Sequence, residues 1–309
     1  MHIAVFGSGA VGGYYGARLA RAGHRVTFIA RGAHLQAIRE RGLLVWSPLG
    51  DFLVRAEADS EPERVGPVDL VLLAVKTYHN PEVLPRVPAL CGPATSVLTL
   101  QNGVDSVDEL AAAVGEARVI AGTTYIATAI AAPGVIEQTG FHRRVILGEA
   151  FGDRTRISER VAHIAEVLRD ADVQAEAVPD GRVPVWEKLI YLAPFAAFTG
   201  AARRPAGAIW HDEVSRAAFL AVVQEVEAVA RAEGVPVAGD MQQRVTDYMN
   251  ALPPSTRSSL LIDLQQGKRT EVEALQGAVV RRGQARNVPT PGMQALHAVL
   301  RAASQAGRA

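Results

Sequence analysis

The chain begins with a short apolar run that leads directly into a cluster of glycines. His2–Phe6 is typical of a strand, the motif GSGAVG follows at residues 7–12, and Val11–Ala22 then has helical spacing. Between a strand and a helix, Gly7 suits a tight turn, Gly9 the close approach of a pyrophosphate, and Gly12 close helix–strand packing. Unpaired N–H groups and the dipole at that helix N-terminus favour an anion. The predicted dinucleotide contacts are Gly7, Ser8, Gly9, Ala10, Val11 and Gly12.

The first half of the chain alternates strand-like and helix-like segments. Strands are predicted at His2–Phe6, Arg25–Ala30, Val68–Val75, Ser96–Leu100 and Arg118–Thr123, and helices at Val11–Ala22, Ala33–Arg41, Pro81–Leu90 and Val107–Val114. This alternation is typical of a parallel, doubly wound sheet. The alternation then loosens: Gly134–Gln138 and Arg144–Leu147 are predicted as extra strands, and Ile157–Asp170 as a further helix.

The second half of the chain has a different character, which begins after the turn-rich Val178–Gly181. Helical spacing is found in Val183–Ala202, Asp212–Glu233, Ala238–Ala251 and Thr270–Arg286, without a strong strand pattern. We therefore predict an α/β protein in which a Rossmann-type, doubly wound domain (residues 1–180) precedes an all-helical domain (residues 181–309).

Composition excludes several classes of partner. Among the 309 residues, 32 Lys and Arg balance 32 Asp and Glu, so no overall charge attracts nucleic acid or an acidic membrane surface. One cysteine, Cys91, cannot form an intramolecular disulfide, and the histidines lack the spacing of a metal site. The longest uncharged runs are interrupted by Gly, Pro and polar residues, so no membrane span is predicted. We expect a cytoplasmic protein.

The second predicted strand indicates which dinucleotide is bound. A carboxylate at its end would accept hydrogen bonds from the ribose hydroxyls of NAD, but this chain has Arg31 there. A guanidinium pairs bidentately with a phosphate and stacks on adenine. Arg31 therefore favours NADP (NADPH) as the cofactor, the alternative being an ordinary solvated arginine.

Two more polar residues follow predicted strands at the edge where open α/β sheets bind ligands. Lys76 comes directly after the apolar run that ends at Val75, and Asn102 belongs to the sequence QNG. Lys76 could bind the cofactor, and Asn102 could donate a hydrogen bond to a substrate oxygen. A surface lysine and an Asn-Gly turn are the alternatives.

The order of these features resembles that of the ketopantoate reductase (2-dehydropantoate 2-reductase) family over nearly the whole chain. The matching pieces are GSGAVG, Arg31, VKT at residues 75–77, QNG at 101–103, WEKL at 186–189, RSS at 257–259 and TE at 270–271. The resemblance implies a Rossmann domain and a helical domain that together hold NADPH and a 2-keto acid. It is compatible with a homodimer.

The resemblance also implies roles for individual residues. Lys188 matches the family's catalytic lysine, which gives a proton to the oxygen of the reduced carbonyl. Asn102 matches a residue that touches both cofactor and substrate. Lys76 and Glu271 match residues on the cofactor side, and Ser259 matches a serine that binds the substrate carboxylate. Because a free lysine is a poor acid at neutral pH, we expect its surroundings to lower the pKa of Lys188.

The chain departs from the family where asparagines or a glutamine would contact the substrate. Those positions hold Leu192, Ala196, Ala206 and Ile262. Buried polar atoms without partners cost about 1–3 kcal/mol each, so this pocket should bind a small hydroxylated keto acid less well. We expect Leu192 and Ala196 to line a pocket for a more apolar 2-oxo acid or a related ketone. Alternatively, Arg203, Arg204 or Arg257 replaces the lost contacts by binding a carboxylate.

The sequence therefore predicts an NADPH-dependent reductase of a 2-keto acid, either 2-dehydropantoate or a more apolar analogue. The first alternative is a reductase of a different ketone or of an imine. The second is an NADP-binding redox sensor without turnover, which would need the glycine motif and Arg31 but no acid such as Lys188.

Overall fold

The computed structural model describes residues 1–305, which fall into two compact units. The first comprises Met1–Gln101 and Ser106–Arg182, and the second comprises Asn102–Asp105 and the chain from Val183 onward. The predicted combination of an α/β part and a helical C-terminal part is confirmed. The grouping of Asn102–Asp105 with the helical unit has no counterpart in the local sequence pattern.

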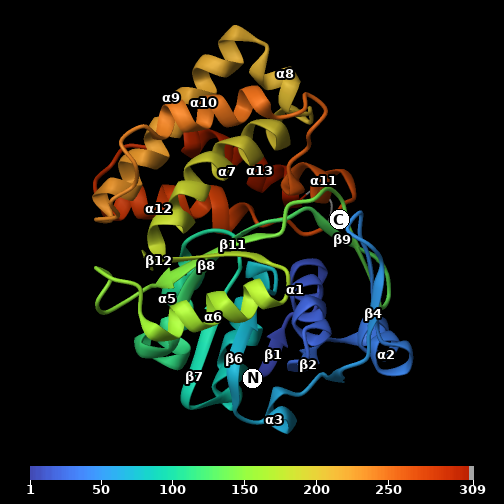
Figure 1. Cartoon of the computed structure of the whole chain (residues 1–309). Coiled ribbons are helices and arrows are strands. Elements are labelled where there is room, and N and C mark those ends of the chain that lie inside the picture. Colours follow the sequence, from blue (N-terminus) through green and yellow to red (C-terminus); the bar gives the residue numbers. More distant parts are fainter. Residues whose placement is uncertain (306–309) are drawn as a thin grey trace. The chain divides into compact units, whose positions relative to one another are not determined.

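An eight-stranded sheet forms the centre of the first unit (Figure 1). Its order is β12-β11-β8-β7-β6-β1-β2-β5. The strands are β1 (His2–Phe6), β2 (Arg25–Ile29), β5 (Glu57–Asp59), β6 (Val68–Leu73), β7 (Cys91–Thr99), β8 (Val119–Tyr125), β11 (Arg144–Glu149) and β12 (Gln174–Asp180). The neighbouring strands β8, β7, β6, β1, β2 and β5 are parallel to one another, as the alternating pattern predicts.

One edge of this sheet is not wholly parallel, and it is formed by strands that follow the alternating part of the chain. β11 runs antiparallel to β8 because the chain between them forms strands instead of a crossover helix. β12 then pairs parallel with β11 over residues that include the segment predicted as a turn. Pro179 is tolerated in β12 because an edge strand can lack one ladder hydrogen bond.

A second sheet of four strands packs against the first helix. Its order is β4 (Phe52–Val54), β3 (Leu43–Trp46), β10 (Val135–Gln138) and β9 (Thr128–Ala132). Helix α1 (Ala10–Arg21) contacts strands of both sheets. Tyr14, Tyr15 and Leu19 of α1 are fully buried in that position. The helix that follows the glycine motif is therefore fixed on two sides.

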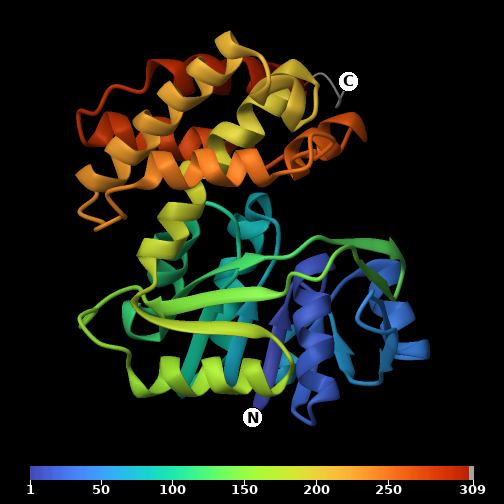
Figure 2. The ribbon, with the colours of Figure 1, turned by 45° about the horizontal axis from the view of Figure 1, so that its top comes forward.

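The remaining helices of the first unit cover the large sheet. They are α2 (Gly32–Arg41), α3 (Pro62–Val65), the 3-10 turn Thr77–His79, α4 (Asn80–Val83), the 3-10 segment Leu84–Leu90, α5 (Asp105–Val114), the 3-10 turn Glu116–Arg118 and α6 (Glu159–Asp170). The oxygen of Ser158 caps α6 by accepting from the Val161 N–H. Figure 2 shows α6 in yellow-green along the strands β11 and β12, which it contacts.

The second unit is helical over its described residues (Figure 1). It contains α7 (Arg182–Ala202), α8 (Ala206–Trp210), α9 (Glu213–Ala232), α10 (Met241–Ala251), α11 (Ser259–Gln265), a π-helical turn at Glu273–Gly277, α12 (Ala278–Ala285) and α13 (Pro291–Gln305). Helix α7 continues through Pro194, and most of its side chains from Leu189 onward are buried. Among residues 1–305, no helix combines the length and apolarity that a membrane span requires.

Two glycines of the GSGAVG motif are required by close contacts within the protein. Gly7 has a φ of +99°, and a Cβ there would lie 2.6 Å from the Val75 nitrogen. A Cβ at Gly12 would lie 2.2 Å from the Gly7 carbonyl oxygen. Gly9 differs, because the nearest atom to a Cβ there is Cδ1 of Ile130, at 4.0 Å. Packing within the chain therefore does not explain a glycine at position 9.

The variants Gly12→Ala and Gly9→Ala should differ in stability. The Cβ that Gly12→Ala introduces would force α1 away from β1, so the free energy of unfolding should fall by about 1–3 kcal/mol. Gly9→Ala should change it by less than about 1 kcal/mol, the usual scale for a helix N-cap. Urea unfolding followed by circular dichroism measures both variants. Equal losses would contradict the assignment of the close contact to Gly12.

Candidate functional site

The strands next to β1 end at the same level, which brings three predicted cofactor residues to one edge of the first unit. Phe6 of β1 pairs with Ile29 of β2 on one side and with Leu73 of β6 on the other. The glycine motif, Arg31 and Lys76 therefore follow three neighbouring strands at their carboxyl ends. β1 lies where the strand order reverses, which is the usual place for a ligand in an open α/β sheet.

The glycine motif leaves the start of α1 open to an anion. The first N–H bonded within the helix is that of Gly13, which donates to the Gly9 carbonyl at 2.7 Å. The N–H groups of Ala10, Val11 and Gly12 precede it and have no partner within the helix. Within residues 1–305, no side chain caps this end of α1. These donors and the open space at Gly9 fit a pyrophosphate.

The side chain of Ser8 forms hydrogen bonds within the protein. It is buried, and Oγ donates to the carbonyls of Val5 and Ile29, each at 3.2 Å. The N–H groups of Gly7 and Ser8 also donate to the Ile29 carbonyl. The hydroxyl of Ser8 therefore ties the end of β1 to the end of β2, so a cofactor contact of Ser8 stays a prediction.

His34 of α2 forms a hydrogen bond to the glycine motif, and the sequence analysis did not select it as a site residue. Its Nδ1 accepts from the Gly134 N–H at 3.0 Å, so Nε2 carries the proton and donates to the Ser8 carbonyl at 2.8 Å. Burial lowers the pKa of His34, although the bond to Ser8 opposes that shift. A neutral imidazole therefore connects the glycine motif with the turn between β9 and β10.

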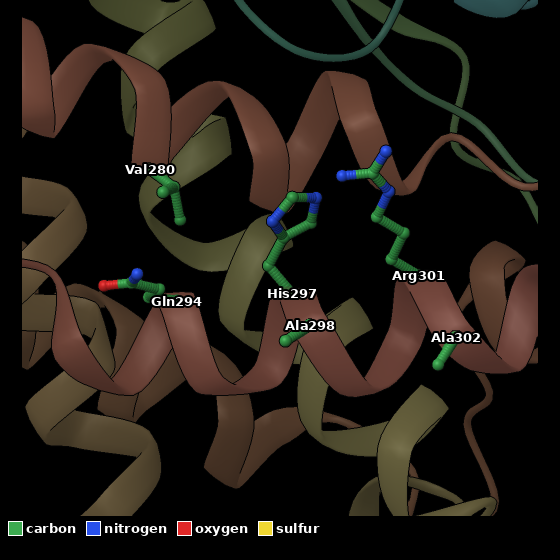
Figure 3. A pocket seen from close by; sticks show the side chains of 6 residues that line it. All are labelled: Val280, Gln294, His297, Ala298, Arg301 and Ala302. Atoms are coloured by element: carbon green, nitrogen blue, oxygen red, sulfur yellow. The ribbon is translucent and has the colours of Figure 1, made fainter.

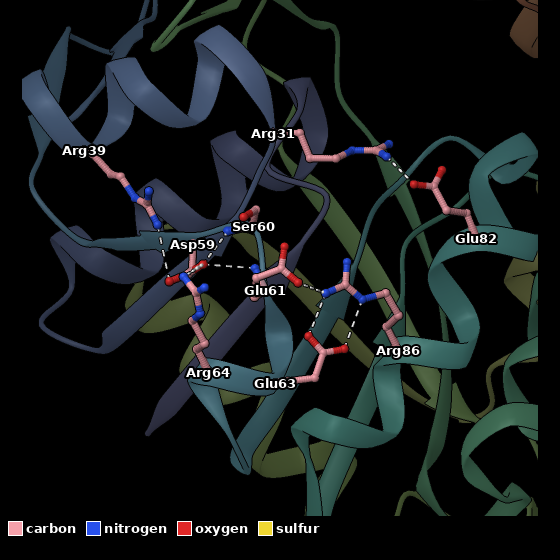
Figure 4. Close-up of polar contacts among 9 residues, drawn as sticks. All are labelled: Arg31, Arg39, Asp59, Ser60, Glu61, Glu63, Arg64, Glu82 and Arg86. Atoms are coloured by element: carbon pink, nitrogen blue, oxygen red, sulfur yellow. Dashed lines mark hydrogen bonds and ion pairs between the residues drawn. The ribbon is translucent and has the colours of Figure 1, made fainter.

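Arg31 stands at the start of α2, directly after β2, and forms an ion pair with Glu82 of α4 (Figure 4). Both side chains are more than half exposed, at 57% and 60%. Exposed pairs of this kind contribute about 0–1 kcal/mol, so an anionic ligand can displace Glu82 from Arg31.

Lys76 follows β6, in a segment that lies against the glycine motif. The preceding residue, Val75, is the one whose nitrogen a Cβ at Gly7 would meet. Gln101 fixes this segment, because its Nε2 donates to the Val75 carbonyl at 2.9 Å and to Oδ1 of Asn80 at 2.7 Å. Lys76 is half-buried, and its contact with a cofactor stays a prediction.

Three residues that the sequence analysis selected lie together in the second unit. Nζ of Lys188, on α7, donates to Oδ1 of Asn102 at 3.1 Å. Nδ2 of Asn102 donates to Oε2 of Glu271 at 3.5 Å. The amide oxygen thus faces the ammonium group and the amide N–H faces the buried carboxylate, so its dipole is aligned between opposite charges.

The surroundings of Lys188 change its acidity in the expected direction. Burial lowers the pKa of Lys188 to about 8, and the negative charge of Glu271 opposes the shift. A lysine with this pKa is still largely protonated at neutral pH, yet it releases its proton much more readily than a solvated lysine. Lys188 is therefore suited to act as a proton donor.

The segment Asn102–Asp105 is held in the second unit by contacts at both ends. Gly103 has a φ of +83°, and a Cβ there would lie 2.4 Å from the Ala274 carbonyl oxygen in the π-helical turn. The carboxylate of Asp105 accepts from Arg281 at 2.8 Å and from Arg282 at 2.7 Å. Gly103 and Asp105 thus place Asn102 next to Glu271. The local sequence did not predict this contact.

The predicted substrate residues have different surroundings. Leu192 is half-buried one helical turn after Lys188, whereas Ala196 is only 1% exposed. Ser259 is exposed in the first turn of α11, next to the capping residue Ser258, whose Oγ lies 2.8 Å from Oγ1 of Thr199 on α7. Thr199 is eleven residues beyond Lys188, so Ser259 is not joined to Lys188 through this contact, and its role stays a prediction.

The other residues at which the chain departs from the family lie in the same unit. Ala206 is 2% exposed and Ile262 is half-buried. The three candidate arginines are exposed. Arg203 donates to the Leu264 carbonyl at 3.4 Å and Arg257 to Oε1 of Gln265 at 3.2 Å. Carboxylate binding by Arg203, Arg204 or Arg257 stays a prediction.

A pocket of about 500 Å³ lies elsewhere in the second unit (Figure 3). It is lined by Val280, Gln294, His297, Ala298, Arg301 and Ala302, from α12 and α13. None of the predicted site residues lines it. The carboxylate of Glu273 already lies 3.3 Å from His297 and 3.6 Å from Arg301.

An open helix N-terminus at the carboxyl edge of a parallel sheet is typical of dinucleotide-binding α/β proteins. A helical unit that carries a buried lysine with a lowered pKa narrows that class. Two family models match the chain. "Ketopantoate reductase PanE/ApbA" matches residues 3–152, and "Ketopantoate reductase PanE/ApbA C terminal" matches residues 182–304. The chain belongs to the ketopantoate reductase family, so the resemblance seen in the sequence is confirmed.

Individual relatives agree with this assignment. A 2-dehydropantoate 2-reductase of Mesorhizobium japonicum is 33% identical, with 97% of each chain covered. A ketopantoate reductase structure from Ralstonia eutropha is 34% identical, covers 100% of both chains and has a TM-score of 0.90. A D-mandelate dehydrogenase solved with NADH and anilino(oxo)acetate has a TM-score of 0.89 at 21% identity and 100% coverage of both chains, so it shares the fold.

The lowered pKa of Lys188 should be visible in the pH dependence of stability. The unfolded chain binds more protons than the folded one between about pH 8 and 10.5, so stability from this residue rises with pH through that window. Lys188→Met removes the burial penalty and should be about 1–3 kcal/mol more stable than wild type at pH 7, an advantage that disappears near pH 10.5.

Denaturant unfolding from pH 7 to 10.5 tests this expectation, with Lys268→Met as the control because Lys268 is exposed. The control should keep a constant difference from wild type. A difference for Lys188→Met that does not change with pH would show that the pKa of Lys188 is ordinary.

Proposed function

We propose that the protein is an NADPH-dependent reductase that converts a 2-oxo acid into the 2-hydroxy acid. The observation that carries this proposal is the hydrogen-bonded row of Lys188, Asn102 and Glu271. Reduction of a carbonyl needs a proton for the oxygen, and a lysine whose pKa is about 8 meets that need.

A nicotinamide cofactor bound at the glycine motif would supply the hydride for the carbonyl carbon. As the C=O bond becomes a C–O single bond, its electron pair moves to the oxygen, and Nζ of Lys188 gives its proton to that atom. Asn102 orients the ammonium group through Oδ1, and Glu271 fixes the amide through Nδ2. The product is the neutral hydroxyl group, and Lys188 recovers its proton from solvent.

The first unit supports NADPH as the hydride source. The N–H groups of Ala10, Val11 and Gly12 would bind the pyrophosphate, and the guanidinium of Arg31 would bind the 2′-phosphate. The exposed position of Arg31 leaves its fork accessible to a ligand. Lys76 would add a further positive charge on the cofactor side.

Two substrates are candidates. Relatives that are 33% and 32% identical are named 2-dehydropantoate 2-reductase, which favours 2-dehydropantoate. The half-buried Leu192, where the family has an asparagine, favours a more apolar 2-oxo acid because it offers methyl groups instead of hydrogen bonds. In either case Ser259 is the proposed contact of the substrate carboxylate.

Lys188→Ala should lower kcat by about 100- to 10,000-fold, the usual contribution of a positioned general acid. NADPH absorbance, followed with 2-dehydropantoate and with a panel of larger apolar 2-oxo acids, measures this loss and ranks the substrates. Lys188→Arg is the matched control, because arginine keeps the positive charge but does not release a proton. It should be as slow as the alanine variant.

If wild type reduces no carbonyl compound but binds NADPH, the alternative of a redox sensor replaces the enzymatic proposal. An alanine variant as fast as wild type would remove Lys188 from the mechanism.

Arg31→Ala should weaken NADPH binding by about tenfold or more and leave NADH binding nearly unchanged, because only NADPH carries the 2′-phosphate. Gly9→Ala is the matched control, since its methyl group would meet the pyrophosphate and should weaken both dinucleotides. Titration calorimetry measures the dissociation constants of NADPH and NADH for wild type and for both variants. Equal binding of NADPH and NADH by wild type would contradict the assigned role of Arg31.

A further inference from the structure

Glu82 is the residue that contacts Arg31 in the structure, and neither the sequence pattern nor the proposed function gives it a role. We propose that Glu82 is a specificity residue for the dinucleotide. Its carboxylate holds the Arg31 guanidinium and competes with the 2′-phosphate for it, so Glu82 limits the preference for NADPH over NADH. This inference rests on the proposed binding of NADPH at Arg31.

The other acidic side chains near the end of β2 are already occupied (Figure 4). Oδ1 of Asp59 accepts from the N–H groups of Ser60 and Glu61 at 2.7 and 3.0 Å, and Oδ2 lies 3.3 Å from Arg39. Arg86 binds the carboxylates of both Glu61 and Glu63. Of the acidic residues in Figure 4, Glu82 is the one whose carboxylate forms an ion pair with Arg31.

The backbone that carries Glu82 is fixed by a buried residue two positions earlier. Asn80 is 3% exposed, and its Oδ1 accepts from Nε2 of Gln101 at 2.7 Å. Its Nδ2 donates to Oγ of Ser106 at 3.2 Å and to Oε2 of Glu109 at 2.6 Å. Asn80 thereby anchors α4, which keeps the carboxylate of Glu82 within reach of Arg31 when a ligand arrives.

The charges then act differently on the two dinucleotides. A 2′-phosphate must displace Glu82 from Arg31 and afterwards lies close to a second negative charge, which raises its dissociation constant. A ribose without this phosphate offers hydroxyl groups that can donate to the carboxylate. Glu82 therefore opposes the phosphorylated dinucleotide and is neutral or favourable toward the other.

Glu82→Gln tests the inference, because it keeps the size of the side chain and removes its charge. Titration of the full-length protein with NADP⁺ and NAD⁺ gives the dissociation constants without turnover. We expect Glu82→Gln to bind NADP⁺ about three- to tenfold more tightly and NAD⁺ equally or less tightly. In an Arg31→Ala background, the gain for NADP⁺ should fall below about twofold, because most of the effect acts through Arg31.

Glu176→Gln is the matched control. Glu176 of β12 pairs with Arg144 of β11 at similar exposure, 51% and 49%, at the other edge of the sheet from β2. It should leave both dissociation constants unchanged.

The outcomes separate this inference from the proposed function. If wild type binds NADP⁺ through Arg31 but Glu82→Gln does not bind it more tightly, the role of Glu82 is overturned and the proposed function stands. An equal gain for NADP⁺ and NAD⁺ would also overturn it, since the effect would then not involve the 2′-phosphate. If wild type binds neither dinucleotide, both proposals fail together.

Discussion

The close approach of α1 to the end of β1 is the constraint on which the first unit depends. No Cβ fits between Gly12 and the Gly7 carbonyl, and α1 is packed between two sheets. The N–H groups at the start of α1 are therefore held at a fixed level relative to the ends of β2 and β6. That position, rather than any single side chain, makes the edge of the sheet suitable for a pyrophosphate.

In the second unit, two opposing effects set the protonation of a buried lysine. Burial favours the uncharged amine, and Glu271 favours the charged form from the far side of Asn102. The amide of Asn102 lies between the two charges, since Oδ1 accepts from the ammonium group and Nδ2 donates to the carboxylate.

The sequence pattern predicted β1, α1, β2 and α7 closely, because each has a strong local signal. It missed the short strands β3, β4, β5 and β9, of three to five residues, and also β12, part of which was predicted as a turn. It did not predict the antiparallel pairing of β11 with β8. Such strands are defined by their partners: β5, for example, pairs with β2 across about thirty residues of chain.

The sequence by itself determined the strand–glycine–helix unit and the absence of a carboxylate at the end of the second strand. Through the family resemblance, it also indicated Lys188 as the candidate proton donor. The tertiary structure decided which residues face these groups: Asn102 with Lys188, 86 positions apart, Asn102 with Glu271, 169 apart, and Glu82 with Arg31, 51 apart. Local propensities act over a few residues, whereas these pairs form only when the sheet and the helices fix distant backbones together.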